Sequence, residues 1–428
     1  MDNVRAVALS VLNKCVSAEQ YSNLALDTAL ERHDLKDADR GLLTVLVYGV
    51  LEKQITLDHW IGSLSSRPVE EIDLATRNLL RMGLYQLAFL DRVPDHAAVH
   101  ETVSLASKRT KGFANAILRA FLRADKKIAL PDEKIDPVAY LSVKYSFSPS
   151  VCACFLERFG TERTESLFAA FGKKPPVTLR TNTLLTSRDD LMAQMDARGL
   201  LVKETLESPV GIELEGTPVT AAYGFEEGFF FVQDEASQLC VEALDAKEGM
   251  SILDVCACPG SKSFGAAIDM KNKGRVVSCD LHGNKLSLVQ SGAARLKIDI
   301  VETVARDARD FCAEWENSFD RVLCDVPCSG FGVFAKKPEL RYKDVEKSRG
   351  LPKIQRDILE TACRYVRDGG LLVYSTCTLL PEENQDNVKA FLALHSEFSC
   401  LRMRTLYPDV DGCDGFFFAV LKKITKDA

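Results

Sequence analysis

Two cysteines, Cys328 and Cys377, each follow an apolar segment of the chain that ends in polar residues. Cys328 stands in the motif Asp325-Val-Pro-Cys-Ser-Gly, and Cys377 stands in Tyr374-Ser-Thr-Cys-Thr. A cysteine thiolate can attack an electrophilic carbon and form a covalent intermediate, and a nearby carboxylate such as Asp325 can orient a polar substrate. A buried structural thiol is the alternative for each cysteine, but exposed functional groups collect at the carboxyl edge of a parallel sheet. We therefore predict that these three side chains converge over a ligand site if the two segments are neighbouring strands.

A second stretch with chemical potential is residues 251–263, where an apolar run containing Asp254 breaks at Pro259-Gly260. This pattern predicts a buried strand, a tight turn and a helix whose free amide N–H groups face a ligand. The next predicted strand, residues 275–280, ends in Asp280, at an offset of about 20 residues that lets a carboxylate reach the ribose hydroxyls of an adenosine cofactor. The stretch therefore predicts a pocket for a nucleoside cofactor, although strand-glycine-helix units are common and do not identify the ligand alone.

The elements that must position these residues alternate regularly from Gly249 onward. Such alternation predicts a Rossmann-like α/β domain with a doubly wound, mostly parallel sheet, whose ligand lies at the carboxyl ends of the strands. Asp280, Asp307 and Asp325 stand at those ends. The C-terminal segment 414–423 is predicted to be an antiparallel strand at the end of the sheet. The predicted strands are 252–256, 276–280, 302–305, 321–325 and 371–375, and the predicted helices are 263–270, 284–296, 308–315 and 352–366.

The N-terminal part of the chain, residues 1–128, is predicted to be an all-α bundle, because apolar residues recur there at helical spacing. Asp37 is predicted to cap one helix, and Pro94-Asp95 marks the break before another. Seven lysines and arginines against one acid fall within residues 108–127, which predicts an RNA contact, with a solvated helix face as the alternative. The predicted helices are 5–16, 23–32, 37–53, 56–64, 74–90, 99–108 and 112–123.

Residues 129–240 are predicted to form a small α+β domain between the helical part and a third domain at 241–428. Its apolar patterns and turn residues predict a linker and a βαβ unit, followed by a strand that passes into a helix. The segments are a linker at 131–137, a helix at 149–171, a strand at 176–182, a helix at 187–198, a strand at 200–202 and a strand-helix pair within 229–244.

Composition limits the classes of protein to which the chain can belong. Of its 428 residues, 46% are hydrophobic and 27% are charged, as in soluble globular proteins, and no apolar segment approaches the roughly 18 residues of a membrane span. An acid at Asp2 stands where a signal peptide needs positive charge, so a cytoplasmic location is expected. The fourteen cysteines lie in apolar contexts that predict reduced thiols, and the Cys-x-Cys pairs at 152–154 and 256–258 lack zinc spacing, so no metal is expected. With a net charge of −7, nucleic-acid binding must depend on local patches.

Several motifs together resemble one protein family. They are Asp254-Val-Cys-Ala-Cys-Pro-Gly-Ser-Lys262, Cys279-Asp280, Asp325-Val-Pro-Cys-Ser-Gly330, Lys337-Pro-Glu-Leu-Arg341, Ser375-Thr-Cys-Thr378, Pro381-Glu-Glu-Asn384 and Asp414-Gly-Phe-Phe417. In this order they resemble the bacterial Sun (RsmB) group of 16S ribosomal RNA cytosine-5 methyltransferases, within the NOL1/NOP2/Sun family. The N-terminal part is similar to the RNA-binding antitermination factor NusB, through residues 94–99 and 112–119. The resemblance implies a class I methyltransferase domain behind a NusB-like bundle.

The resemblance also implies a reaction, methyl transfer from S-adenosylmethionine to C5 of a cytosine in RNA. Cytosine C5 is too weak a nucleophile until a thiolate attacks C6 and converts the ring into an enamine. Cys377 is implied to be this nucleophile, Cys328 to assist product release, and Asp325 to face the cytosine edge or the methionine end of the cofactor. The sequence alone does not order the two cysteines, because DNA cytosine methyltransferases place the nucleophile in a Pro-Cys motif.

The loop that ends at Lys262 is implied to wrap the methionine part of the cofactor, with Asp280 at the ribose and Asp307 near the adenine. Ser261 departs from the family pattern Cys-Ala-Ala-Pro-Gly-Gly-Lys-Thr, and at a position with positive φ it would cost roughly 1 to 2 kcal/mol relative to glycine. Cys258 and Ser263 depart from it as well. The implied cofactor-binding residues are Cys256, Ala257, Cys258, Pro259, Gly260, Ser261, Lys262, Asp280, Asp307 and Asp325.

The substrate is expected to be an unstacked or single-stranded segment of 16S ribosomal RNA, because the target base must leave its stack. The protein is expected to be a monomer. Lys336, Lys337 and Arg341 are expected to meet phosphates near the target, with a solvated loop as the alternative. Two other functions remain open, namely methylation of transfer RNA and a non-catalytic RNA-binding or antitermination role.

Overall fold

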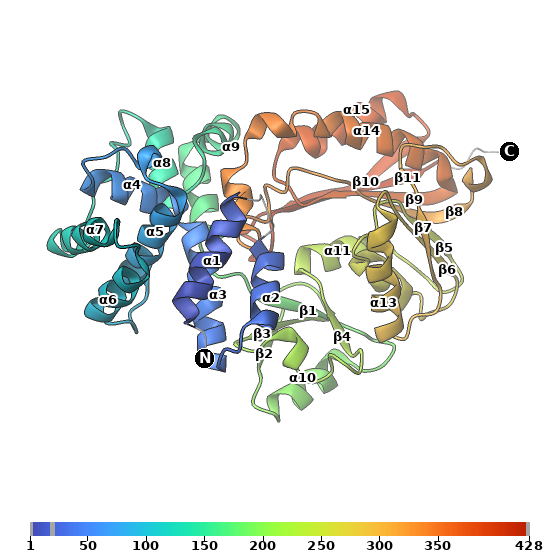
Figure 1. The fold of residues 1–428 in the computed structure, drawn as a ribbon. Helices are drawn as coiled ribbons and strands as arrows, with labels where there is room; N and C mark the ends of the chain where they lie inside the picture. The colour runs from blue at the N-terminus through green and yellow to red at the C-terminus, as the bar shows by residue number, and fades with distance from the viewer. Residues whose placement is uncertain (1–2, 18–21, 425–428) are drawn as a thin grey trace. The chain divides into compact units, whose positions relative to one another are not determined.

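The computed structural model describes residues 3–17 and 22–424, which form two compact units (Figure 1). Unit 1 comprises Met1–Gly172 and Phe334–Val345, and unit 2 comprises Lys173–Val333 and Glu346–Ala428. The chain therefore leaves unit 2 after Val333 and returns to it at Glu346. In the described part of the chain, no helix has both the length and the apolar character to cross a membrane.

Unit 1 is a helical bundle, as its apolar periodicity predicts. Its core consists of aliphatic side chains that recur at helical spacing on the inner faces of the helices, with the two aromatic rings of Trp60 and Phe121 stacked at 5.0 Å between centroids. Short 3₁₀ turns join some of the helices. The helices are α1 (Val4–Ser17), α2 (Ser22–Arg32), α3 (Asp37–Glu52), α4 (Gln54–Leu64), α5 (Leu74–Phe89), α6 (Asp95–Leu105), α7 (Lys111–Arg123), α8 (Pro137–Tyr145) and α9 (Pro149–Phe171).

Three details of unit 1 differ from the prediction. Helix α6 begins at Asp95, before the predicted start at Val99. The prediction missed this start because Asp95 and His96 are exposed and do not show the apolar spacing of a helix. Helix α8 was not predicted, although Asp136 caps it by accepting a hydrogen bond from the backbone N–H of Ala139 at 2.9 Å. Asp37 is the first helical residue of α3 and makes no capping bond, so its predicted role as a cap is wrong.

The segment 334–345 is anchored in unit 1 by a buried arginine. Arg341 is fully buried, and its guanidinium donates hydrogen bonds to the backbone oxygens of Tyr145 at 3.2 Å and Phe171 at 2.6 Å. Phe334, from the same segment, packs edge-on against Phe147 at 4.9 Å between centroids. The expectation that Arg341 meets RNA phosphates is therefore wrong, because a guanidinium enclosed in the protein cannot reach a phosphate.

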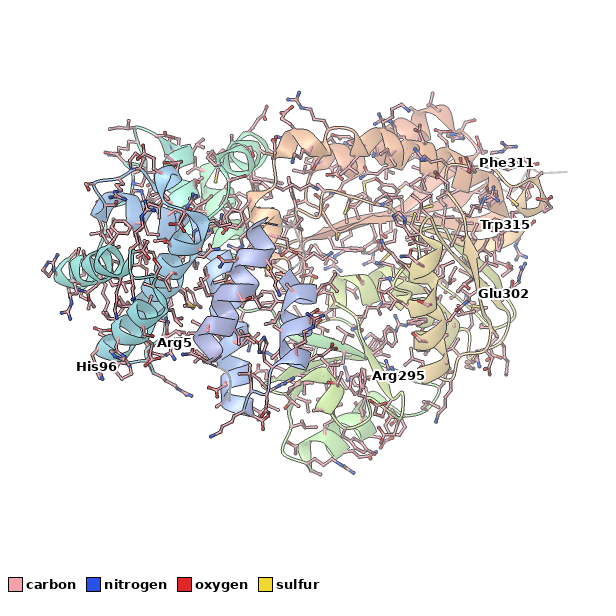
Figure 2. The ribbon with its side chains drawn as sticks, in the orientation of Figure 1. Arg5, His96, Arg295, Glu302, Phe311 and Trp315 are labelled. Atoms are coloured by element: carbon pink, nitrogen blue, oxygen red, sulfur yellow. The ribbon has the colours of Figure 1, made fainter. Side chains whose placement is uncertain are left out.

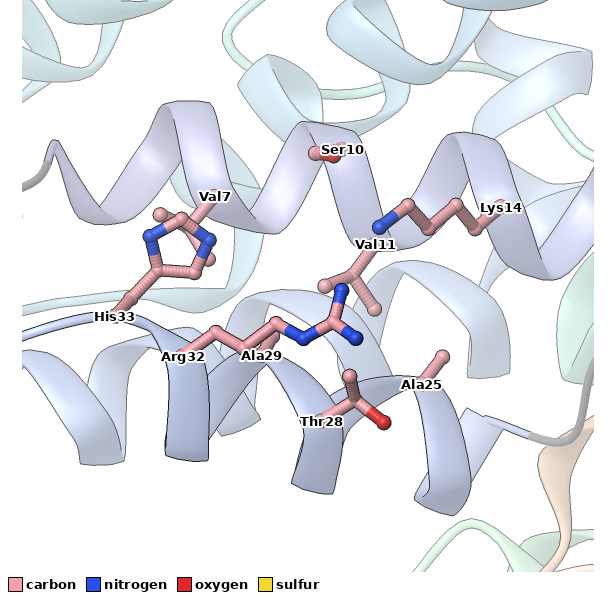
Figure 3. Close-up of a pocket in the computed structure, with 9 residues that line it drawn as sticks. All are labelled: Val7, Ser10, Val11, Lys14, Ala25, Thr28, Ala29, Arg32 and His33. Atoms are coloured by element: carbon pink, nitrogen blue, oxygen red, sulfur yellow. The ribbon is translucent and has the colours of Figure 1, made fainter.

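The helices of the bundle enclose several pockets, and two of these lie at helix–helix seams and contain basic side chains. One lies between α1 and α2, where Lys14, Arg32 and His33 meet the apolar Val7 and Val11 (Figure 3). The other is a groove of about 460 Å³ between α6 and α7, lined by His96, Lys111 and Arg119 among others (His96 is labelled in Figure 2). The basic span at residues 108–127 begins just before α7 and ends in the turn after it. Two of its cations are paired with acids, Lys126 with Asp95 and Lys127 with Asp125.

Unit 2 begins with a four-stranded antiparallel sheet in the order β2-β3-β1-β4. The predicted βαβ unit is present, but its two strands are separated by β3, which the sequence analysis missed. Phe230, Ile212 and Leu179 bury their side chains against α10, so this small sheet has its own hydrophobic core. The elements are β1 (Val177–Thr181), α10 (Arg188–Asp196), β2 (Leu201–Glu204), β3 (Gly211–Glu215) and β4 (Phe230–Val232).

The larger sheet of unit 2 has seven strands in the order β10-β11-β9-β8-β5-β6-β7. The strands from β9 to β7 in this order are parallel, which confirms the predicted doubly wound fold. One apolar cluster joins one face of the sheet to α11, α12 and α13, and a second joins the other face to α14 and α15 (Figure 1). The strands are β5 (Ser251–Asp254), β6 (Arg275–Asp280), β7 (Val301–Ala305), β8 (Phe319–Asp325), β9 (Val366–Thr376), β10 (Phe398–Leu406) and β11 (Phe416–Lys423), and the helices are α11 (Glu235–Ala243), α12 (Ser261–Asp269), α13 (Leu286–Arg295), α14 (Leu351–Ala362) and α15 (Gln385–Leu394).

The edges of this sheet correct two predictions. Strand β11 is antiparallel to β9 as expected, but it is not the last strand, because β10 pairs with its outer edge. Strand β10 is mostly exposed, and its apolar Leu401 and Met403, which alternate with arginines, lie at the surface and not in the core. The predicted helix 308–315 is wrong, since only a 3₁₀ turn at Ala313–Trp315 forms there. The rings of Phe311 and Trp315, which are labelled in Figure 2, both pack on Tyr365, and this contact replaces helical packing.

Candidate active site

The two cysteines of the predicted catalytic motifs meet at the carboxyl edge of the large sheet. Strands β8 and β9 are parallel neighbours, with Asp325 opposite Ser375, so the loops that follow them leave the sheet side by side. The sulfur atoms of Cys328 and Cys377 lie 3.2 Å apart. The backbone N–H of Gly332 donates to the carbonyl of Cys377 at 3.0 Å, which ties the first loop to the second. The predicted convergence of the thiols is therefore present in the fold.

The surroundings of Cys328 keep its thiol protonated. Its contact with Cys377 and its burial raise the pKa of Cys328 well above the ordinary value of a thiol, and the charge of Glu383 acts in the same direction. A protonated Cys328 can donate its S–H to the neighbouring sulfur. The pair can thus hold one thiolate and one thiol in contact, which suits a nucleophile and a proton donor.

Asp325 forms an ion pair with Lys262 in the same unit. The Lys262 ammonium lies 2.7 Å from Asp325 Oδ2, and the Ser375 hydroxyl donates to Asp325 Oδ1 at 2.7 Å. Burial lowers the pKa of Lys262, but the negative groups around it, Asp325 first among them, together raise it by more, so the net pKa lies above the ordinary value of a lysine. Lys262 was predicted only as part of the cofactor loop, and its pairing brings a fixed cation to the strand end that precedes Cys328.

The predicted cofactor loop has the backbone geometry that its glycine suggested. It runs from the end of β5 to the start of α12, and Gly260 adopts a left-handed conformation with φ of 108°. A Cβ at Gly260 would lie 2.6 Å from the ring of Phe264, so only glycine fits there. Ser261 is the first residue of α12 and does not have a positive φ, so its departure from the family pattern carries no backbone strain. No side chain caps this helix, which leaves first-turn amides available to a ligand.

The acids predicted to hold the nucleoside stand on neighbouring strands. Asp280 ends β6, opposite Ala305 in β7, and Asp307 follows β7. The guanidinium of Arg309, at 2.6 Å, holds the pKa of Asp307 below its ordinary value, so an adenine would share this carboxylate with Arg309. Carboxylates at adjacent strand ends beyond a glycine turn fit a nucleoside cofactor.

The cysteines of the loop are poor nucleophiles. Burial, followed by the charge of Asp280, raises the pKa of Cys258 to about 12. Burial also raises the pKa of Cys256 well above its ordinary value. These two thiols, with Ala257 and Pro259 between and after them, therefore line the loop as neutral groups. All fourteen cysteines are free thiols, and the residues described hold no group of three or more His, Cys, Asp or Glu side chains placed to bind a metal ion.

Asp254 is a site residue whose importance the sequence analysis missed. It is 1% exposed at the end of β5, where it accepts hydrogen bonds from the Ser263 hydroxyl at 2.7 Å and the Cys256 amide at 3.4 Å. Burial raises the pKa of Asp254 to about 7. Its place at a strand end, directly before the glycine turn, was the signal available in the sequence. Asp254 links the strand to α12 and so sets the shape of the loop.

The Asp254 carboxyl should make the stability of the protein depend on pH. Its pKa is about 7 in the folded protein against 3.8 for an ordinary aspartate, so folding favours the protonated form. Stability should therefore fall as pH rises from about 4 to 7, by up to about 4 kcal/mol. An Asp254→Asn variant should lack this component. Urea unfolding of both proteins between pH 4 and 8 measures this component, because the other titrating groups are shared by the two proteins. A difference in the free energy of unfolding between wild type and variant that stays constant with pH would contradict the prediction.

Comparison with known proteins places this geometry among methyltransferases. Residues 241–422 match the family described as "16S rRNA methyltransferase RsmB/F", residues 2–123 match the "NusB family", and residues 153–220 match the "Methyltr_RsmF/B-like, ferredoxin-like domain". In that order, the matches correspond to the large sheet, to the helical bundle, and to strands β1, β2 and β3 of the small sheet with the helix before them.

Full-length relatives share this arrangement. The chain is 36% identical to "Probable ribosomal RNA small subunit methyltransferase B" of Bacillus subtilis, over 98% of this chain and 99% of that protein. It is 33% identical to "Ribosomal RNA small subunit methyltransferase B" of Escherichia coli, again over 98% and 99% of the two chains. Among solved structures, "Crystal Structure of PH0851" is similar with a TM-score of 0.81 and 25% identity, over 99% of each chain. The similarity thus extends through every domain.

Proposed function

The chain belongs to the RsmB/F family of 16S rRNA methyltransferases, and we propose that it methylates C5 of a cytosine in 16S ribosomal RNA through a covalent enzyme-RNA intermediate. The observation that carries this proposal is the contact of Cys328 and Cys377, with sulfur atoms 3.2 Å apart, beside the ion pair of Asp325 and Lys262. The cofactor is S-adenosylmethionine, which supplies an electrophilic methyl group when it is bound.

Cys377 is the nucleophile in this proposal. Its thiolate, stabilised by the S–H of Cys328, forms a bond to C6 of cytosine, and the electron pair of the C5–C6 double bond moves onto the ring to make C5 nucleophilic. With the methyl group on C5 and S-adenosylhomocysteine as the other product, water takes the C5 proton. The electron pair of the C5–H bond re-forms the C5–C6 double bond, and the electron pair of the C6–S bond leaves with the Cys377 sulfur. Cys328 assists this last step because its protonated thiol can donate to the departing Cys377 sulfur.

Asp325 binds the polar edge of the cytosine. Ser375 and Lys262 each occupy one lone pair on a different carboxylate oxygen, and a carboxylate has about four such sites, so Asp325 can still accept from the exocyclic amine. Lys262 keeps the carboxylate in place and offers positive charge to the ring as electron density moves onto it. The pair thereby distinguishes cytosine from uracil, which has no amine at this position.

The cofactor lies against the turn between β5 and α12. The amides of this turn and the edge of Gly260 would hold the methionine part, Asp280 the ribose and Asp307 the adenine side. The RNA segment must present an unstacked base. We assign RNA contact to residues 1–128, where the basic span lies, and to the small domain at 129–240, and catalysis to residues 241–428. A ribosomal RNA substrate favours a cytoplasmic location.

The test is a comparison of 5-methylcytosine in RNA from cells with and without this protein. Bisulfite sequencing should show one 16S rRNA cytosine that loses its methyl group in the deletion strain and regains it when the gene is restored. Purified protein with S-adenosylmethionine should methylate that cytosine in 16S rRNA transcripts and not in transfer RNA. A methyl group lost only from transfer RNA, or no change in either RNA, would overturn the proposal.

A further inference from the structure

A buried carboxylate holds the peptide groups on both sides of Cys328. Glu383, in a 3₁₀ turn at Pro381–Glu383, is 1% exposed, and its Oε2 accepts hydrogen bonds from the backbone N–H of Ser329 at 2.9 Å and from Gln355 Nε2 at 2.7 Å. The same Gln355 nitrogen donates to the carbonyl of Pro327 at 3.0 Å. Glu383 and Gln355 therefore hold the residue before and the residue after Cys328.

The loop that carries Cys377 is attached to the same turn. Asn384, the residue after Glu383, donates to the carbonyl of Thr378 at 2.9 Å and accepts from the hydroxyl of Thr376. The two loops also meet directly, through the hydroxyls of Ser329 and Thr378 at 2.7 Å. One short turn therefore holds the flanking residues of both cysteines, although the two loops follow different strands.

The buried position of Glu383 is costly for an acid. Its other oxygen, Oε1, is buried and has no hydrogen-bond partner among residues 3–17 and 22–424, and burial raises the pKa of Glu383. An incompletely bonded buried acid costs stability, and folds retain such groups mainly where function requires them. The charge of Glu383 is also one of the causes that raise the pKa of Cys328.

We propose that Glu383 is a positioning residue that holds the Cys328 thiol against the sulfur of Cys377. It touches neither RNA nor cofactor in this proposal and acts through the peptide that follows Cys328. The inference builds on the proposed function, because it assigns a role within that reaction. Misplacement by about 1 Å of a group that must meet a reacting atom commonly costs 10²-fold in rate.

Three variants test the proposal. Glu383→Ala removes both acceptor bonds, Glu383→Asp keeps the charge but withdraws the oxygens, and Glu383→Gln keeps an oxygen that can accept from Ser329 and Gln355. Asp386→Asn is the control, since Asp386 is an exposed acid of the adjacent helix α15. Thermal unfolding of each variant shows whether it is folded before any other measurement.

The first measurement needs no activity. Diamide oxidises two thiols that are in contact to a disulfide, and mass spectrometry of peptides identifies the Cys328–Cys377 bond. We expect wild type, Glu383→Gln and Asp386→Asn to form it at rates within about threefold of one another, and Glu383→Ala and Glu383→Asp to form it on the order of 10-fold more slowly. Disulfide formation at the wild-type rate in Glu383→Ala and Glu383→Asp would overturn the proposal. If the alanine variant is unfolded, formation at the wild-type rate in Glu383→Asp alone would overturn it.

The second measurement is the split between kcat and KM for methylation of 16S rRNA. Glu383→Ala and Glu383→Asp should lose about 100-fold in kcat with KM for RNA and for S-adenosylmethionine within about threefold, and Glu383→Gln should recover most of the loss. A purely structural role would instead lower the unfolding temperature and weaken both substrates together, which would also overturn the proposal. If wild type forms the disulfide rapidly but methylates no RNA, the positioning role stands and the proposed function fails.

Discussion

Replacement of Cys377 by alanine should lower methyl transfer to RNA by on the order of 10⁴-fold or more, because C5 of cytosine has no route to nucleophilicity without the bond from sulfur to C6. Transfer of a labelled methyl group from S-adenosylmethionine to 16S rRNA measures the rate. The variant should also fail to form a stable adduct with RNA that contains 5-fluorocytosine, in which a fluorine that cannot be eliminated replaces the C5 proton. Binding of the cofactor should be unchanged, since we propose that its pocket lies at the turn between β5 and α12.

Cys400→Ala is the matched control for this prediction. Cys400 is an exposed cysteine in the edge strand β10, so its loss should leave both the rate and the adduct at wild-type levels. A Cys377→Ala protein that still methylates RNA and still traps the fluorinated substrate would show that the nucleophile has been assigned to the wrong residue.

Replacement of Cys328 by alanine should have the opposite signature, an accumulation of covalent protein-RNA complex. Attack by Cys377 remains possible, but the departing sulfur loses the thiol that lies 3.2 Å away and donates to it. Turnover should fall by on the order of 10² to 10⁴-fold, the usual contribution of a general acid or base, while a complex that survives denaturing electrophoresis builds up on unmodified RNA.

The double variant Cys328→Ala/Cys377→Ala is the control for this adduct and should form none. If the Cys377→Ala protein accumulates the complex and the Cys328→Ala protein does not, the roles of the two cysteines are reversed. That outcome would place the nucleophile in the Pro-Cys motif, the alternative that the sequence left open. Glu383 would then position the nucleophile, Cys328, and not the cysteine that assists product release.

Much of the fold was predictable because its elements have strong local patterns. The α/β alternation after Gly249 follows from continuous apolar runs in buried strands, and the helices before residue 128 follow from apolar residues at helical spacing, so both are visible in short windows of sequence. Strand β3 and helix α8 were missed because each follows a segment rich in polar residues, and strand β10 was missed because most of its residues are exposed. The wrong helix at 308–315 has helical periodicity, but its rings pack on Tyr365 from a distant element.

The sequence by itself determined the catalytic motifs, the glycine turn and the strands that carry them, because these depend on residues close together in the chain. Only the tertiary structure decided that Cys328 and Cys377 are in contact, that Lys262 pairs with Asp325, that Arg341 is buried in unit 1 and that the turn with Glu383 and Asn384 holds both cysteine loops. Each of these joins residues that are far apart along the chain. Their distances depend on which strands are neighbours and on how side chains pack between them, and local backbone preferences contain no information about either.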